Sequence, residues 1–224
     1  GVQTCALPIL YAPVAILAAL RHRDATGEGQ VIDMALLDTQ VAMLANLGAN
    51  YLVTRQPPRR AGNAHQNIVP YQVFEVAPAP DGSKDHLILA VGNDGQFAKF
   101  CAVAGHPEWA ADERFATNPA RVAHRAVLIP LLRQATVMRS TAEWIAALED
   151  AGVPCGPINR LNEVFADPQV LARGLKVDMP HPQFGSVPLV ANPIRLSATP
   201  VQYRVAPPTL DEHGAAVLRD WLGR

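Results

Sequence analysis

The sequence predicts an α/β fold in which part of a large domain is joined to a smaller α+β domain, and three patterns support this prediction. Near the amino terminus, apolar residues at helical spacing are followed by a glycine turn and a short strand-like segment. Two strand-like segments then flank a connection rich in proline and glycine. Helical patterns dominate after this hairpin, which is typical of an α+β domain.

The first three predicted segments belong to the larger domain. Residues 10–23 are predicted to be helical because apolar residues recur there every three or four positions. Residues 30–34 are predicted to be a strand, and residues 37–52 a second helix. The run Pro-Pro-Arg-Arg at residues 57–60 ends this pattern, so we expect the chain to cross between domains there.

The smaller domain is predicted to begin with an antiparallel pair of strands, over residues 69–77 and 86–91. Three helices are predicted to follow, over residues 95–103, 120–136 and 141–151. Ser140 and Glu143 have the spacing of a capping box, which marks the start of the third of these helices. We expect Trp109, Phe115 and Trp144 to fill the core.

The last part of the chain alternates short elements with proline-rich segments. Residues 161–173 are predicted to be helical with an interruption near Pro168, and two short strands are predicted over residues 176–179 and 186–190. A final helix is predicted from Thr209, which begins a second capping-box pattern, to Leu222.

Composition limits the classes of function. The chain has 224 residues, of which 49% are hydrophobic and 17% charged, with a formal net charge of -1, so nucleic acid is not expected as a partner. The most apolar segment, residues 6–20, is interrupted by two prolines and is shorter than the roughly 20 residues that span a bilayer. No membrane partner is therefore expected. Three widely spaced cysteines favour reduced thiols, a cytoplasmic location and no metal site.

The segment over residues 60–71 is the most informative part of the sequence. Gly62 and Asn63 tolerate left-handed backbone geometry, and Ala64 allows the main chain to approach a ligand closely. His65 and Gln66 follow and precede an apolar, strand-like segment. Two interpretations remain open: an ordinary turn before a strand, or a loop that moves over a ligand.

Three motifs in this order resemble the class III CoA-transferases: residues 27–38, with the sequence GEGQVIDMALLD, the segment 60–71, and residues 151–158, with the sequence AGVPCGPI. The resemblance runs from about residue 10 to residue 222 and covers the later part of a family member, whose usual length is close to twice that of this chain. It implies the class III CoA-transferase fold with an incomplete large domain. The expected domains are a leader at 1–9, part of the large domain at 10–60, the loop and small domain at 61–180, and a return to the large domain at 181–224.

The resemblance also implies a chemistry. In this family a buried aspartate attacks the thioester of an acyl-CoA, and the reaction passes through an aspartyl anhydride and an enzyme-CoA thioester to a new acyl-CoA. A loop excludes water from these intermediates, and it corresponds here to Gly62, Asn63, Ala64, His65 and Gln66. The expected substrates are an acyl-CoA and a carboxylic acid, with coenzyme A acting as a substrate group and no permanently bound cofactor. Formyl-CoA transferase has a run of glycines here, so a stiffer loop is expected.

The family register places the catalytic aspartate on Cys5, within a segment that does not resemble the family. We therefore expect a truncated or misassembled gene, with no catalytic residue in the chain and no activity from these residues alone. A nucleophilic role for Cys5 is the less favoured alternative, because nothing in the sequence activates its thiol. Apolar faces of residues 10–23 and of the carboxyl-terminal segment are then expected to be exposed.

Three further candidates and two further functions remain open. His65 is a candidate ligand contact; Asp94 fits either a helix cap or an anion site; and Arg55, Arg59 and Arg60 fit either a phosphate site or a solvated turn. The alternatives to CoA transfer are an acyl-CoA racemase or epimerase of the same fold, and an inactive fragment that oligomerises. The resemblance implies an interlocked homodimer for the full-length protein.

Overall fold

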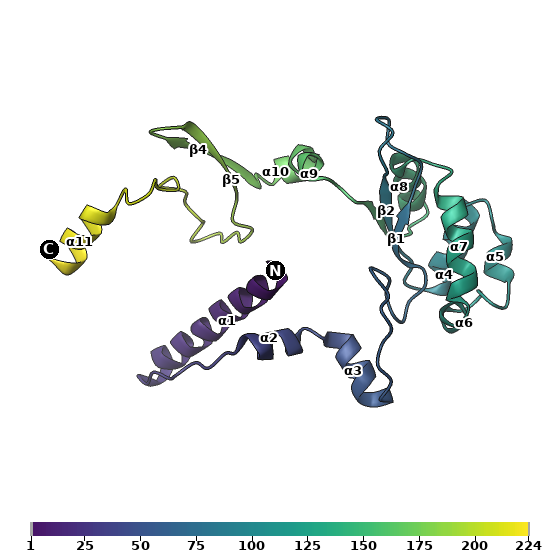
Figure 1. Cartoon of the computed structure of the whole chain (residues 1–224), viewed down its shortest axis with the longest axis horizontal. Helices are drawn as coiled ribbons and strands as arrows, with labels where there is room; N and C mark the ends of the chain where they lie inside the picture. Colours follow the sequence, from purple (N-terminus) through teal and green to yellow (C-terminus); the bar gives the residue numbers. More distant parts are fainter. Residues whose placement is uncertain (1, 224) are drawn as a thin grey trace. The chain divides into compact units, whose positions relative to one another are not determined.

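The computed structural model describes the backbone of residues 2–223 (Figure 1) and the side chains of residues 8–223. Contacts along the backbone divide the chain into two units, Gly1–Gly156 and Pro157–Arg224, and each is described by itself. The structure is a mixture of helices and strands, as the sequence predicts. The domain boundaries expected at residues 60 and 180 stay a prediction.

The first unit begins with three helices, α1 (Val2–Thr26), α2 (Leu36–Ala42) and α3 (Ala45–Thr54). Helix α1 includes the predicted helix of residues 10–23 and extends it at both ends, with Pro8 and Pro13 inside it. Its apolar side chains are largely exposed: Leu10 is 67% exposed and Leu17 is 65% exposed. The expected exposure of apolar side chains on this helix is therefore observed.

Two predictions for this region are wrong. Residues 30–34 form no strand, and Val31 is 95% exposed. A strand needs a hydrogen-bonded neighbour, and the sheets of the described chain contain only strands β1 to β5, none of which pairs with this segment. The single helix predicted over residues 37–52 is instead the pair α2 and α3, because the positive φ of Ala45 (45°) cannot continue a right-handed helix.

The centre of the first unit is a three-stranded sheet in the order β1-β2-β3, formed by β1 (Tyr71–Glu75), β2 (His86–Ala90) and β3 (Cys155–Pro157). Strands β1 and β2 are antiparallel, with Phe74 opposite Leu87, which confirms the predicted hairpin. Alternate residues of both strands are buried, so one face of the hairpin supplies the core.

Five helices accompany this sheet: α4 (Asp94–Val103), α5 (Glu108–Ala111), α6 (Asn118–Ala123), α7 (Arg125–Thr136) and α8 (Thr141–Asp150). The predicted helix 120–136 is divided into α6 and α7 at His124, whose φ of -103° and ψ of 21° lie outside the helical range. The capping box of Ser140 and Glu143 is confirmed at the start of α8, and Gly152, with a φ of 70°, lies just beyond its end.

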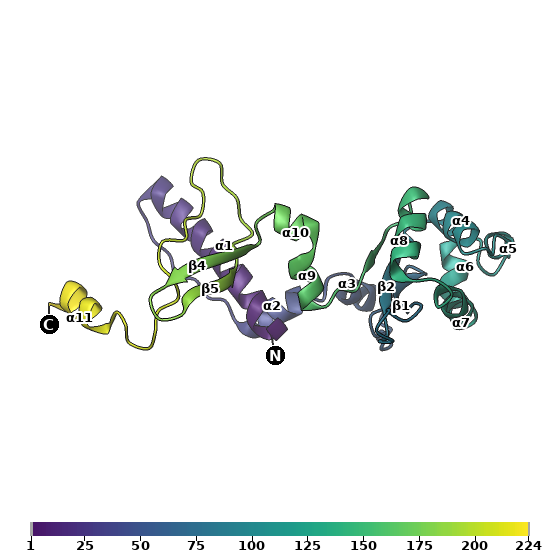
Figure 2. The same ribbon diagram turned by 90° about the horizontal axis from the view of Figure 1, so that it is seen from above.

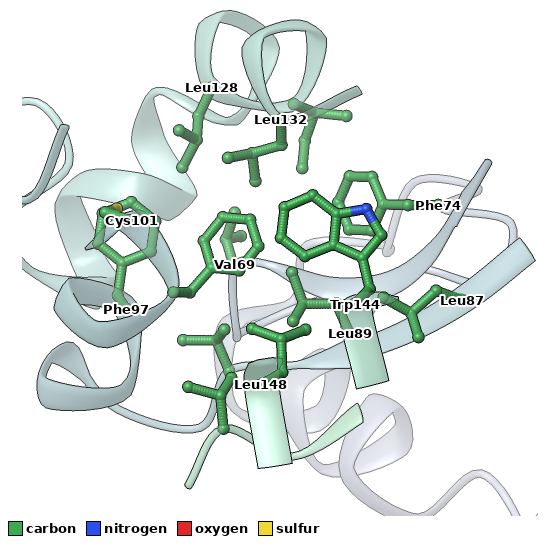
Figure 3. Close-up of a cluster of buried hydrophobic side chains, with 14 of the residues drawn as sticks. Val69, Phe74, Leu87, Leu89, Phe97, Cys101, Leu128, Leu132, Trp144 and Leu148 are labelled. Carbon is green, nitrogen blue, oxygen red and sulfur yellow. The ribbon is translucent and has the colours of Figure 1, made fainter. Parts of the chain in front are cut away.

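The core of the first unit gathers side chains from the sheet and from α4, α7 and α8 (Figure 3). Trp144 of α8 is 1% exposed, and its Nε1 donates to the carbonyl oxygen of Thr136 at 2.8 Å. Phe115 is fully buried, whereas Trp109 packs on the cluster and is only partly buried. The prediction that these aromatic residues fill the core is confirmed, with Trp109 at its edge.

The second unit consists of short elements: α9 (Leu161–Ala166), α10 (Pro168–Ala172), β4 (Lys176–His181), β5 (Gly185–Val190) and α11 (Gly214–Leu222). Asp167 caps α10 and interrupts the predicted helix where Pro168 suggested. Strands β4 and β5 lie side by side as an antiparallel pair (Figure 2).

The final helix begins at Gly214 rather than at Thr209. The carboxylate of Glu212 still accepts a hydrogen bond from the backbone N–H of Thr209 at 2.7 Å, so the capping contacts form without a helix directly behind them. Trp221 is 83% exposed, so this segment also presents apolar surface. No helix within residues 2–223 combines the length and the apolar character needed to cross a membrane.

Candidate functional site

The loop before β1 folds back on that strand through hydrogen bonds of its own. Gly62 has a φ of 63°, a geometry that favours glycine, and the N–H of Ala64 donates to the carbonyl oxygen of Ala61 at 3.1 Å. The side-chain oxygen of Asn63 accepts from the N–H of Val73 at 3.2 Å. Gly62 and Asn63 therefore form a turn before β1, as the interpretation of this segment as an ordinary turn requires.

His65 is held in place by its neighbours. Its ring stacks on Tyr71 with 5.4 Å between the ring centroids, and its Nδ1 accepts from the N–H of Asn67 at 3.1 Å. The backbone N–H of His65 donates to the carbonyl oxygen of Tyr71 at 2.9 Å. With Nδ1 serving as an acceptor, the neutral ring carries its proton on Nε2, which remains the only nitrogen able to donate to a ligand.

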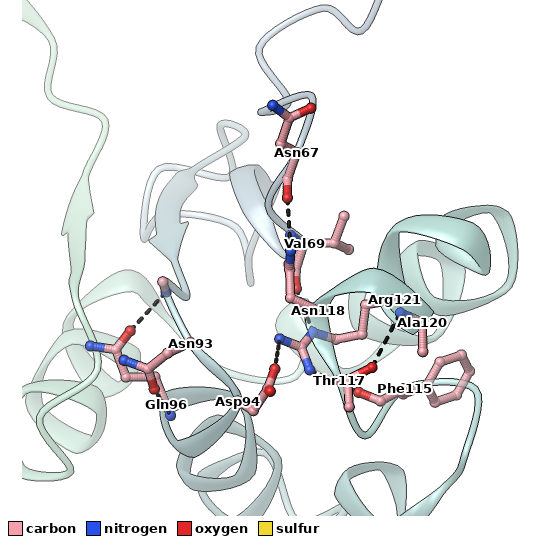
Figure 4. Close-up of polar contacts among 11 residues, drawn as sticks. Asn67, Val69, Asn93, Asp94, Gln96, Phe115, Thr117, Asn118, Ala120 and Arg121 are labelled. Carbon is pink, nitrogen blue, oxygen red and sulfur yellow. Dashed lines mark hydrogen bonds and ion pairs between the residues drawn. The ribbon is translucent and has the colours of Figure 1, made fainter. Parts of the chain in front are cut away.

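Helices α6 and α7 bind the carbonyl groups of this loop with three side chains, Asn118, Arg121 and Arg125, of which Figure 4 labels the first two. Arg125 donates from Nη2 to the carbonyl oxygens of His65, at 2.7 Å, and Gln66, at 2.9 Å. Asn118 donates to the carbonyl oxygen of Asn67 at 2.8 Å and accepts from the N–H of Val69 at 3.1 Å. Burial lowers the pKa of Arg125, although the guanidinium remains charged.

Arg121 is the third of these side chains and is fully buried. Its Nε donates to the carbonyl oxygen of Val69 at 2.6 Å, and its Nη1 donates to that of Phe115 at 2.8 Å. Its Nη2 forms an ion pair with Asp94 at 2.8 Å, and its guanidinium lies 4.4 Å from the ring centre of Phe97. Asp94 is thus engaged by Arg121, while Asn93 accepts the capping bond from Gln96.

Three residues that bind the loop were not predicted from the sequence: Asn118, Arg121 and Arg125. Their spacing of three and four residues places side chains on one side of a helical segment, which is the signal that could have found them. Their partners in the loop lie 49 to 60 residues earlier, so the sequence does not show which loop groups they bind.

A pocket of about 790 Å³ lies against the loop, within the first unit. Its charged lining comes from four arginines, Arg59 and Arg60 before the loop and Arg125 and Arg133 on α7. The residues that line it include Gly62, Asn63, Ala64, Gln66 and Gln72, and no Asp or Glu. The sequence suggested Arg55, Arg59 and Arg60 as either a phosphate site or a solvated turn. Arg59 and Arg60 line this pocket, and Arg55 does not.

No nucleophile is assembled at this pocket from the described side chains. The side chain of Cys5 lies outside the described residues. Burial raises the pKa of Cys101 to about 12, and burial together with Glu149 raises the pKa of Cys155, so neither thiol is activated. Within the described residues, no group of three or more His, Cys, Asp or Glu side chains is arranged to hold a metal ion.

Comparison with proteins of known name links this architecture to one family. The sequence profile of "CoA-transferase family III" matches residues 6–214. The chain is 49% identical over 211 residues to a succinate–glutarate CoA-transferase of Agrobacterium fabrum, a match that covers 94% of the chain and 51% of that protein. It is 38% identical to the human succinyl-CoA:glutarate CoA-transferase, over 95% of the chain and 47% of that protein. The chain thus spans about half the length of these relatives.

Solved structures give the same assignment. A CAIB/BAIF family protein from Brucella suis superposes with a TM-score of 0.75 at 47% identity, covering 96% of the chain and 54% of that protein. A Mycobacterium tuberculosis protein that is 23% identical has a TM-score of 0.72 and shares the fold. Because the profile match covers most of the chain and the relatives are CoA-transferases, the chain belongs to CoA-transferase family III.

Proposed function

We propose that the protein transfers CoA from an acyl-CoA donor to a carboxylic acid acceptor. The observation that carries the proposal is the 49% identity, over nearly the whole chain, to a relative named for CoA transfer between succinate and glutarate. Relatives named for other acceptors, such as oxalate and D-citramalate, match at 32% and 30% identity. A dicarboxylic acid is therefore our first choice of acceptor.

The proposed reaction uses a carboxylate nucleophile. An aspartate attacks the thioester carbonyl of the donor, the C–S bond breaks, and CoA leaves as the thiolate while an anhydride forms. The thiolate attacks the aspartyl carbonyl to give an enzyme-CoA thioester and releases the donor acid. The acceptor carboxylate then attacks this thioester, which releases the CoA thiolate and forms a second anhydride. The thiolate finally attacks the acyl carbonyl of the acceptor, which gives the new acyl-CoA and restores the aspartate. We place this aspartate outside residues 10–224, because no described Asp or Glu lines the pocket at the loop.

In this proposal the loop of Gly62 to Gln66 keeps water from the anhydride and the thioester. Its carbonyl groups at His65 and Gln66 are bound by Arg125, so the far end of the loop is held while the part around Gly62 retains the freedom of a glycine. We further propose that the full-length protein works as an interlocked homodimer in the cytoplasm.

The test is an assay of the protein expressed from its complete gene with succinyl-CoA and glutarate. Glutaryl-CoA should appear in step with the loss of succinyl-CoA, as measured by mass spectrometry. A racemase or epimerase would instead exchange the α-hydrogen of a branched acyl-CoA with solvent deuterium and form no new thioester. Deuterium exchange without transfer would contradict the proposal.

The same assay on residues 1–224 alone tests where the nucleophile lies. We expect no transfer from these residues, because the pocket at the loop contains no carboxylate that could form the anhydride. Transfer by the 224-residue chain at the rate of the complete protein would refute our placement of the aspartate.

A further inference from the structure

The pocket beside the loop concentrates positive charge without a counter-charge. Arg59, Arg60, Arg125 and Arg133 line it, and none of its lining residues is acidic. Arg125 is partly engaged by the loop carbonyl groups. Among the described residues, Arg59, Arg60 and Arg133 have no hydrogen bond or ion pair from their guanidinium groups. Arg59, Arg60 and Arg133 are exposed, so water and salt screen part of their mutual repulsion, and an anion bound between them would reduce it further.

Gln72 of β1 adds a neutral donor and acceptor to the pocket. It is only 6% exposed and lines the pocket, yet its side-chain amide forms no hydrogen bond with any described residue. Among the described residues no buried side-chain nitrogen or oxygen lacks a partner, so the small exposed part of Gln72 includes its amide, which lies at the surface of the pocket. The amide of Gln72 is therefore free to bind a group that enters the pocket.

The chemistry of the lining selects an oxyanion. Guanidinium groups bind carboxylates and phosphates through paired N–H donors, and the amides of Asn63, Gln66 and Gln72 add neutral donors. The volume of about 790 Å³ lies within the range of small-molecule sites, of order 300–1,000 Å³. A ligand with two or more negative charges matches this lining better than one with a single charge.

We propose that this pocket, lined by Arg60, Gln72, Arg125 and Arg133, is a subsite for a dianionic oxyanion ligand. Its source is either the dicarboxylic acid acceptor or the phosphate groups of coenzyme A, and the naming of these two sources rests on the proposed function. The described lining supplies cations and amides and no carboxylate, so its proposed role is to bind a ligand.

Isothermal titration calorimetry on the protein expressed from its complete gene tests this proposal without turnover. The probes are glutarate, adenosine 3′,5′-bisphosphate and acetate, the last as a monoanion control. The variants are the double substitution Arg60→Gln/Arg133→Gln and the single substitution Gln72→Glu, which keeps the size of the side chain and adds a negative charge. Arg173→Gln, at an exposed arginine of the second unit, is the matched control.

We expect at least one dianion to bind more tightly than acetate, and to bind about tenfold or more weakly in both pocket variants but unchanged in Arg173→Gln. If the variants weaken the binding of glutarate alone, the ligand is the acceptor acid, and if they weaken the binding of the bisphosphate alone, the ligand is coenzyme A. If they weaken the binding of both, the pocket is a shared oxyanion subsite. The inference is overturned if neither dianion binds, or if the pocket variants, shown to be folded by circular dichroism, bind as the control does.

The result is separable from that of the transfer assay. Dianion binding that depends on Arg60 and Arg133 in a protein without transfer activity would leave this subsite standing and remove the proposed function. If instead Arg60→Gln/Arg133→Gln transfers CoA with an unchanged KM for both substrates, the proposed function stands and this subsite is removed.

Discussion

Arg121 donates a 2.6 Å hydrogen bond from Nε to the carbonyl oxygen of Val69, two residues before β1 begins. Both residues are almost completely buried, at 0% and 1% exposure. The same guanidinium reaches Phe115 and Asp94, so a single side chain joins the end of the loop to α4 and to the segment before α6. The position of the loop is thus coupled to the core of the first unit.

Replacing Arg121 by methionine should strongly destabilise the first unit. The substitution leaves two buried carbonyl groups without their donor, each at a cost of about 1–3 kcal/mol, so we expect a loss of at least about 3 kcal/mol in the free energy of unfolding. Urea denaturation followed by tryptophan fluorescence measures this loss.

Asp94→Asn is the matched control for Arg121→Met. The Asp94 side chain is 51% exposed and can be hydrated, so its change should cost about 1 kcal/mol or less. Equal losses for the two variants would show that the ion pair, rather than the buried carbonyl contacts, carries the stability.

Replacing Arg125 by glutamine should loosen the loop without unfolding the protein. The variant loses two hydrogen bonds from a charged donor to the carbonyl groups of His65 and Gln66. Amide hydrogen exchange of His65 and Val69 should accelerate about tenfold. The amide of Ala90, which donates to Pro154 in the sheet, should keep its protection. Unchanged exchange at His65 would mean that Arg125 does not hold the loop.

Cys101 should make stability depend on pH in the alkaline range. Burial raises the pKa of Cys101 from 9.0 to about 12, so the folded thiol keeps its proton at a pH where the unfolded thiol has lost it. The free energy of unfolding should therefore fall as the pH rises from about 9 to about 12, with a slope of at most about 1.4 kcal/mol per pH unit.

Comparison with Cys101→Ala isolates this contribution. The variant has its own cost from the lost packing, but its stability should fall less steeply above pH 9 than that of the parent. Parallel pH profiles would show that Cys101 does not contribute.

Alkylation by iodoacetamide at pH 8 should label Cys155 and leave Cys101 unmodified in the folded protein.

Local features of the structure could be predicted from the sequence, because their causes lie within a few residues. The capping box at Ser140 and Glu143, the hairpin of β1 and β2, and the break before Pro168 are all of this kind. Each depends on hydrogen bonds or steric restrictions between near neighbours, which the order of residue types reveals.

Features that depend on distant partners could not be predicted in the same way. Residues 30–34 have the pattern of a strand but lack a paired neighbour, so they form none. Arg121 binds a carbonyl group 52 residues away, and an arginine in a predicted helix gives no sign that it is fully buried. The loop was found from its residue types, whereas the arginines of α7 that complete its pocket emerged only from the fold.

The most direct test of the account is the partition of succinyl-CoA between transfer and hydrolysis in the protein expressed from its complete gene. With glutarate present, glutaryl-CoA should account for nearly all the succinyl-CoA consumed, and Asn63→Ala/His65→Ala, which removes two contacts that hold the loop, should increase the share lost as free CoA. A protein that forms no glutaryl-CoA, or a loop variant with an unchanged partition, would contradict the claim that this loop protects a CoA-transfer site.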